Sequence, residues 1–333
     1  MSEYFDTEHQ RVVTALQSSL VARSEWPTWL LIVVIYGAWF GTLGLLHAGV
    51  IRLIVATPLL IGVGAWYMSV QHELLHGHPT RRAWLNKLIG YAPIAIWFPY
   101  TLYRDSHLLH HRDEDLTVPD VDPESNYVDA DVWRTMSPVL RGLWHIRKTF
   151  VGRFVVGPPM AVASMCLQTA RQWMRRDWRY LRMWCTHGAL LVAMLVWMEH
   201  WAGVPAWYYL LVVGWPVLSI AMIRSFYEHR AVPAAKTRIT VNDAGMLMRL
   251  LFLNNNYHLV HHDIPSLPWY LLPVVYRLRQ AEYREKCGGF WIRGGYAELL
   301  YRYAFRRTDT PPHPFAGSGT KGDAVIESVV SQR

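Results

Sequence analysis

The chain has 333 residues, of which 52% are hydrophobic and 17% are charged, whereas roughly 25% of the residues of a soluble domain are charged. This balance is typical of a membrane protein. The formal net charge of +8 does not indicate nucleic-acid binding, because Lys and Arg lie at the ends of apolar segments, where basic residues mark cytoplasmic loops. The three cysteines form no C-x-x-C pair, so neither a thiolate metal site nor a disulfide framework is indicated.

Two long apolar segments follow a short N-terminal region. They run from Trp26 to Ala48 and from Val50 to Val70, and each has the ~20 residues that a spanning helix needs. Because only Gly49 separates them, we expect a hairpin that leaves and returns to the same side of the membrane. The N-terminal region has acidic residues and no basic stretch ahead of an apolar run, so we expect no cleaved signal peptide.

Two further apolar segments are interrupted by prolines. Residues 85–103 contain Pro93 and Pro99, and residues 154–170 contain Pro158-Pro159. Arginines flank the second segment on both sides, which indicates that both of its ends are cytoplasmic. A crossing at residues 85–103 would also place the histidines on either side of it on opposite faces of the membrane. We therefore expect both segments to be interfacial or re-entrant.

A second hairpin is expected from residues 183–203 and 206–223, around Val204-Pro205. The predicted fold is an all-α, multi-pass integral membrane protein with four transmembrane helices in two hairpins, two interfacial or re-entrant helices, and a cytoplasmic helical cap. Its predicted regions are a cytoplasmic N-terminal segment (1–25), a membrane domain (26–224), the cap (225–310) and a disordered tail (311–333). In a bacterium the protein would reside in the inner membrane.

Histidines cluster at three places, all on the expected cytoplasmic face. The first box holds His72 and His76, the second His107, His110 and His111, and the third His258, His261 and His262. Histidines three or four residues apart project from one face of a helix, and imidazole is a good ligand for iron, copper, nickel and zinc. Two metal ions sharing eight histidines would have about four ligands each, which leaves positions open for dioxygen or water and indicates a catalytic site.

A zinc hydrolase is an alternative from another functional class. The first box reads His72-Glu73-Leu-Leu-His76, which is the His-Glu-x-x-His pattern of zinc proteases. A zinc site with three ligands leaves the second and third boxes unexplained. A metal transporter is disfavoured, because the histidines lie on one face and are not distributed through the spans.

The three boxes resemble those of the membrane fatty acid desaturase and hydroxylase superfamily, and the resemblance covers residues 26–273. It implies a non-haem di-iron centre in which all eight box histidines are iron ligands, with no catalytic residue separate from the ligands. His229, in Ser225-Phe-Tyr-Glu-His229, is implied as a ninth ligand. Acyl-CoA desaturases carry an asparagine four residues before that histidine, where it holds an iron-bound water. Ser225 replaces it here, and Asn254, Asn255 or Asn256 could compensate.

The remaining histidines are expected to have other roles. We expect His78 to act in a loop or on a ligand, and the others to lie away from the metals: His9, His47, His145, His187, His200 and His313. Carboxylates after the second box could accept hydrogen bonds from the outer ring nitrogens of ligands: Asp113, Asp115, Asp120 and Asp122.

The resemblance implies an enzyme that uses O2 and external electrons to act on a lipid. No flavin or nicotinamide motif occurs in the chain, so a ferredoxin, a cytochrome or a rubredoxin is the expected electron donor. The predicted activity is desaturation of a lipid acyl chain. The alternative on the same site is hydroxylation or ketolation of an ornithine-type amino-lipid or a carotenoid, and ligand spacing does not separate these, because all begin with the same hydrogen abstraction.

Overall fold

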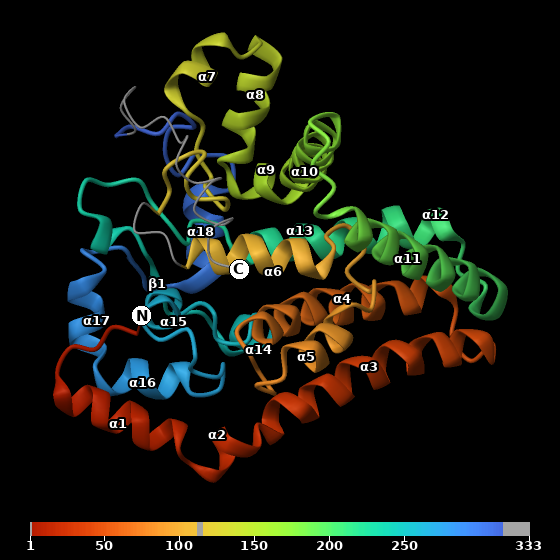
Figure 1. Cartoon of the computed structure of the whole chain (residues 1–333), viewed down its shortest axis with the longest axis horizontal. Coiled ribbons are helices and arrows are strands. Elements are labelled where there is room, and N and C mark those ends of the chain that lie inside the picture. Colours follow the sequence, from red (N-terminus) through yellow and green to blue (C-terminus); the bar gives the residue numbers. More distant parts are fainter. Residues whose placement is uncertain (1, 112–115, 316–333) are drawn as a thin grey trace.

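Four long apolar helices form one end of the molecule (Figure 1). The computed structural model describes residues 2–111 and 116–315. In it the four helices span Trp26–His47 (α3), Leu53–Leu75 (α4), Leu181–Ala202 (α11) and Ala206–Arg224, with mean hydropathies between 1.4 and 2.0. The last comprises α12 (Ala206–Tyr208), a π-helical turn η1 (Tyr209–Val213) and α13 (Gly214–Arg224). All four are long and apolar enough to cross a membrane, which confirms the prediction of four such helices.

Helix α4 lies at the centre of this group, packed against α3 and α13. Its contact with α13 depends on Gly64, because a Cβ there would lie 2.6 Å from Cγ2 of Val217. The π-helical turn η1 directly precedes the Gly214-Trp215-Pro216 sequence of α13. Proline has no N–H to donate within a helix, and a π-helical turn is one way to accommodate such a break.

The two proline-containing segments form shorter helices. Residues 85–103 divide into α5 (Ala83–Gly90), an irregular stretch and α6 (Tyr100–His110). Residues 154–170 belong to α9 (Phe150–Val155) and α10 (Gly157–Met174), with two prolines in the first turn of α10, where proline costs no hydrogen bond. Neither segment is among the four described helices with the length and hydropathy of a membrane span.

The other elements are short and surround the histidines. The N-terminal helices are α1 (Thr7–Gln17) and α2 (Leu20–Ser24), and α7 (Ala130–Thr135) and α8 (Pro138–Arg147) form a lobe with α9 and α10. After α13 come η2 (Ala235–Thr237), β1 (Val241–Asn242), α14 (Met246–Leu251), α15 (His258–Asp263), α16 (Leu272–Leu278), α17 (Gln280–Lys286), β2 (Trp291–Ile292) and α18 (Gly295–Tyr303). Strands β1 and β2 pair in parallel.

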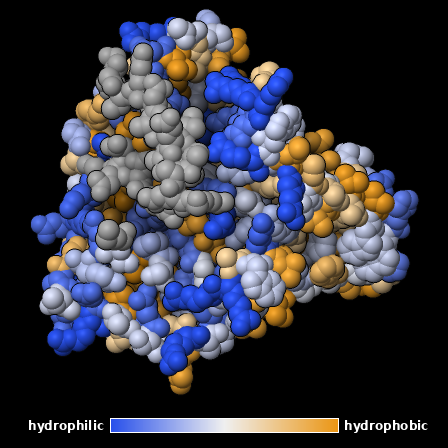
Figure 2. Space-filling view, viewed as in Figure 1, coloured by the Kyte–Doolittle hydropathy of each residue, from blue (hydrophilic) through white to orange (hydrophobic). Residues whose placement is uncertain are grey.

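The described residues form two apolar cores. One lies among the four long helices and the other among residues 223–299, with Val13 of α1 and Leu116 contributing to it. Apolar side chains such as Val33, Phe40 and Val192 remain exposed on the long helices, and Figure 2 shows apolar surface at their end of the molecule and hydrophilic surface toward α1 and α17. This distribution fits an apolar environment around the long helices.

Both termini of the described chain contact the polar part of the molecule. The Glu3 N–H donates to the Asp263 carbonyl (2.8 Å), and Lys286 bridges the carboxylates of Glu3 (2.8 Å) and Asp263 (2.7 Å). At the other end, Val128 pairs with residues 311–313. The disordered tail was predicted to begin at residue 311, but residues 311–313 make these contacts. The rest of that prediction, from residue 316, lies outside the described residues.

Candidate metal centre

The three histidine boxes lie at helix ends that converge. His72 is in the last turn of α4 and His76 is its C-cap, where Gly77 takes a left-handed φ of +88° and ends the helix. The second box lies in the last turns and C-cap of α6, and the third is α15 itself. His229 follows α13, the membrane helix that packs on α4.

Eight of the nine predicted ligand residues form two groups of four. The first group is His72, His76, His107 and His261, and the second group is His110, His229, His258 and His262. Within each group, one ring nitrogen from every residue lies within 4.8 Å of the others. Each group therefore combines residues from several elements of the chain, and the second and third boxes each contribute to both groups.

His111, the ninth residue, lies between the two groups. Its Nε2 is 3.1 Å from Nε2 of His107 and 3.1 Å from Nε2 of His261. Its ring also stacks on that of His262 in the second group, with centroids 4.2 Å apart. The two groups are thus neighbours and form one centre.

Carboxylates accept hydrogen bonds from the outer nitrogens of two of the three second-box histidines. Nδ1 of His107 donates to Oε1 of Glu124 (2.9 Å), and Nδ1 of His110 donates to Oδ1 of Asp122 (2.8 Å). A carboxylate only accepts hydrogen bonds, so the proton lies on Nδ1 and Nε2 of the neutral ring carries a lone pair. Both Nε2 atoms point into the groups, as a metal ligand requires.

The distances between ring nitrogens show whether these residues fit metal ions. His229 Nε2 lies 3.0 Å from His258 Nε2 and 3.2 Å from His110 Nε2. The buried Nε2 atoms of His72 and His76 have no hydrogen-bond partner among the described residues. Lone pairs directed at one another repel unless a cation lies between them, so the residues present fit two metal ions.

Comparison with known proteins agrees with this geometry. The sequence profile of the fatty acid desaturase family matches residues 50–294. This chain belongs to the fatty acid desaturase family. A similar curated protein is the dihydrorhizobitoxine desaturase of Bradyrhizobium elkanii, which is 23% identical over 256 residues, covering 68% of this chain and 68% of that protein. The family match confirms the superfamily that the three boxes suggested.

Burial keeps most of the histidines in this desaturase-family centre neutral. Burial lowers the pKa of His229 to about 3 and that of His111 to about 2, with the neighbouring histidines acting in the same direction. Burial alone would also lower the pKa of His110, but the hydrogen bond to Asp122 and the nearby Glu124 charge outweigh it and raise that pKa to about 9. Neutral imidazoles are the form that binds metal ions, and a cation would oppose protonation of His110.

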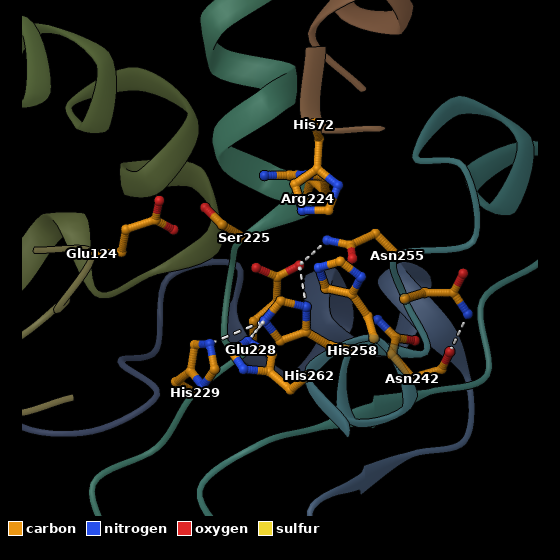
Figure 3. Close-up of polar contacts among 12 residues, drawn as sticks. His72, Glu124, Arg224, Ser225, Glu228, His229, Asn242, Asn255, His258 and His262 are labelled. Atoms are coloured by element: carbon orange, nitrogen blue, oxygen red, sulfur yellow. Dashed lines mark hydrogen bonds and ion pairs between the residues drawn. The ribbon is translucent and has the colours of Figure 1, made fainter. Parts of the chain in front are cut away.

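The sequence identified only some of the carboxylates that lie beside the histidines of this desaturase-family member. Asp122 contacts His110, whereas Asp113 and Asp115 lie outside the described residues, and Asp120 is exposed. Glu124 was missed, although it belongs to the same Asp-Pro-Glu-Ser sequence as Asp122. Glu228 was also missed: its Oε1 lies 3.8 Å from Nδ1 of His258 and accepts from Nδ2 of Asn255 at 3.4 Å (Figure 3). Its position directly before His229 was the available signal.

The hydroxyl of Ser225 already has two hydrogen-bond partners outside the metal groups. Its Oγ accepts from Nη2 of Arg153 (3.1 Å) and donates to the Met222 carbonyl (3.3 Å). Of the three asparagines that could compensate for it, Asn255 donates to Glu228, while Asn254 donates to the Trp269 carbonyl and Asn256 to that of Asn242. Only Asn255 therefore touches the carboxylates of the centre.

The other histidines have partners outside the two groups. Nδ1 of His78 lies 2.6 Å from Oε1 of Glu25, and both side chains are buried. His187 bonds to the Ile96 carbonyl (2.8 Å) and His47 to that of Trp201 (2.6 Å). His145 bonds to Arg307 and His313 to Thr117, while Nδ1 of His9 accepts from the Phe5 N–H. None of these, and not the exposed His200, belongs to the two groups found among the described residues.

Proposed function

We propose that the protein is an O2-dependent di-iron oxidoreductase that desaturates a lipid acyl chain. The observation that carries the proposal is the pair of four-histidine groups, with His111 between them and with carboxylates on the outer nitrogens of His107 and His110. The proposed ligands of two iron ions are His72, His76, His107, His110, His111, His229, His258, His261 and His262. An all-nitrogen environment of this kind suits iron, and open positions suit O2.

Two ferrous ions bound by these histidines would reduce O2 and so supply an oxidant able to remove hydrogen from a C–H bond. Desaturation removes two hydrogen atoms from adjacent carbons, and together with two electrons and two protons from a donor these reduce O2 to two molecules of water. The residues of the chain hold the imidazoles by their outer nitrogens and keep them neutral by burial. The electrons come from a separate ferredoxin, cytochrome or rubredoxin.

The proposed arrangement in the membrane follows the sequence prediction. The helix pairs α3–α4 and α11–α13 form two transmembrane hairpins, and the segments 85–103 and 154–170 lie at the interface. Residues 1–25 and the cap 225–310 are cytoplasmic, with both iron sites on that side. The exposed apolar side chains of the long helices and the position of the histidines at helix ends support this arrangement.

The position of Glu73 gives less support to a zinc hydrolase than to the di-iron proposal. In such an enzyme the glutamate of His-Glu-x-x-His acts as the general base on a metal-bound water. Here Oε2 of Glu73 accepts from the Trp269 N–H (3.0 Å), and Oε1 lies 3.6 Å from Nδ1 of His72, the outer nitrogen. The carboxylate therefore lies on the side of the ring opposite to the proposed ligand atom.

Metal analysis and lipid analysis test the proposal together. The purified protein is expected to hold two iron ions, and lipids from cells that express it are expected to lose two hydrogens in an O2-dependent way, as measured by mass spectrometry. The His261→Ala variant is the inactive control. A single zinc ion with O2-independent activity contradicts the di-iron proposal, whereas gain of one oxygen replaces desaturation by hydroxylation on the same site.

A further inference from the structure

Arg224, the last residue of α13, lies beside the first histidine group. Its charge acts on all four histidines of that group, and Figure 3 draws its side chain in the same part of the centre as His72. Nη2 donates to the hydroxyl of Tyr103 (3.3 Å). Nη1 is buried and has no hydrogen-bond partner among the described residues. An unpaired buried N–H is costly and calls for a specific explanation.

The carboxylates near Arg224 do not provide that partner. Glu124 and Glu228 lie within range of its charge, but no described carboxylate forms an ion pair with the guanidinium within 4.0 Å. Glu124 accepts from His107 instead, and Glu228 accepts from Asn255. The two acids offset the charge of Arg224 at a distance and leave Nη1 available to an acceptor that enters the centre.

We propose that Nη1 of Arg224 binds the carboxylate group of the substrate. A guanidinium offers planar donors that match a carboxylate, and a charge-assisted hydrogen bond is stronger in a buried site than in water. The substrate class is therefore an unesterified fatty acid, whose chain ends in a free carboxylate, and not an ester, amide or thioester. Because Arg224 adjoins the first histidine group, the C–H bond attacked lies near the acid end of the substrate. This inference rests on the proposed function, since it takes the histidine groups as the place of reaction.

The test compares two probes that differ only in charge. Hexanoate and hexanamide are titrated by calorimetry into the iron-loaded protein in nanodiscs, with the iron content of every variant measured. The wild type is expected to bind hexanoate about 10- to 100-fold more tightly than hexanamide, the range expected of a hydrogen bond to a charged group. Arg224→Gln is expected to abolish the preference and Arg224→Lys to retain part of it. Arg277→Gln, which removes the same charge from an exposed site, is expected to retain all of it.

The outcomes separate this inference from the proposed function. Equal binding of the two probes by the wild type overturns the inference, even if the protein holds iron and oxidises a substrate. So does a hexanoate preference that survives in Arg224→Gln, or a loss of turnover in that variant with the preference unchanged. If the wild type holds no iron, the proposed function fails, and titration of the metal-free protein still decides the role of Arg224.

Discussion

The carboxylate of Asp122 lies 2.8 Å from Nδ1 of His110, and both side chains are only 1% exposed. Oδ1 also accepts from the Glu124 N–H (2.9 Å) and Oδ2 from the Thr117 N–H (2.8 Å). The loop that follows the second box thus folds back on it, and one aspartate fixes both the loop and the ring. The N–H of Glu124 is held by this aspartate, and its carboxylate accepts a hydrogen bond from His107 and so fixes a ring of the other group.

Replacing these carboxylates by amides is expected to weaken metal binding. In Asp122→Asn and Glu124→Gln the outer nitrogens lose a charged acceptor, and loss of such a partner typically costs 10–100-fold in metal affinity. The measurement is iron retained during dialysis against a chelator. Asp120→Asn, an exposed change in the same loop, is the control and is expected to behave as wild type. Equal retention by all three variants would show that the loop does not position the ligands.

Removing His229 is expected to affect the second histidine group selectively. Its Nε2 is the closest neighbour of His258 in that group, whereas the first group lacks it. His229→Ala should therefore fall from two iron ions per chain toward one and lose turnover, as measured by elemental analysis and product formation. His200→Ala, at an exposed position, should keep both. Retention of two ions and full activity in His229→Ala would remove this residue from the ligand set.

Ser225→Ala is expected to change stability more than metal content. The hydroxyl accepts from Nη2 of Arg153, a side chain that is 6% exposed, and loss of a hydrogen bond to a charged group costs about 1.5–3 kcal/mol. The midpoint of thermal unfolding should fall while the number of bound iron ions stays at two. Loss of iron without a change in the midpoint would instead assign Ser225 to the metal centre.

Gly64→Ala is expected to destabilise the packing of α4 on α13. Its Cβ would lie 2.6 Å from Val217 Cγ2, and overpacking of this kind typically costs 1–3 kcal/mol. Thermal unfolding of the purified protein measures the effect, and the added change Val217→Ala should restore part of the loss. Gly62→Ala is the matched control, since a Cβ there meets nothing within 4 Å. If both single variants unfold at the same temperature, close approach at Gly64 is unimportant.

Hydropathy and histidine spacing predicted the features that depend on local sequence. Four apolar helices were recognisable because each carries its own signal, and the boxes because three or four residues separate their members. The division into two groups was not predictable, since the second and third boxes are each split: His107 and His261 join the first box, while His110 joins His229, His258 and His262. Such pairing depends on how α4, α6 and α15 meet, and Arg224 has no local pattern that reveals the effect of its charge on distant histidines.

The contacts of Val128 with residues 311 and 313 set an order for assembly during synthesis. Tyr127 is also bonded to Asp309, and Thr117 to His313, so the segment that carries Asp122 and Glu124 is held by one of the last described parts of the chain. The three boxes will all have emerged from the ribosome before this segment is fastened. Loading of the proposed iron ions into a fully ordered centre is therefore expected only after residue 309 has been made, and a nascent chain halted before that residue should present its histidines without their finished support.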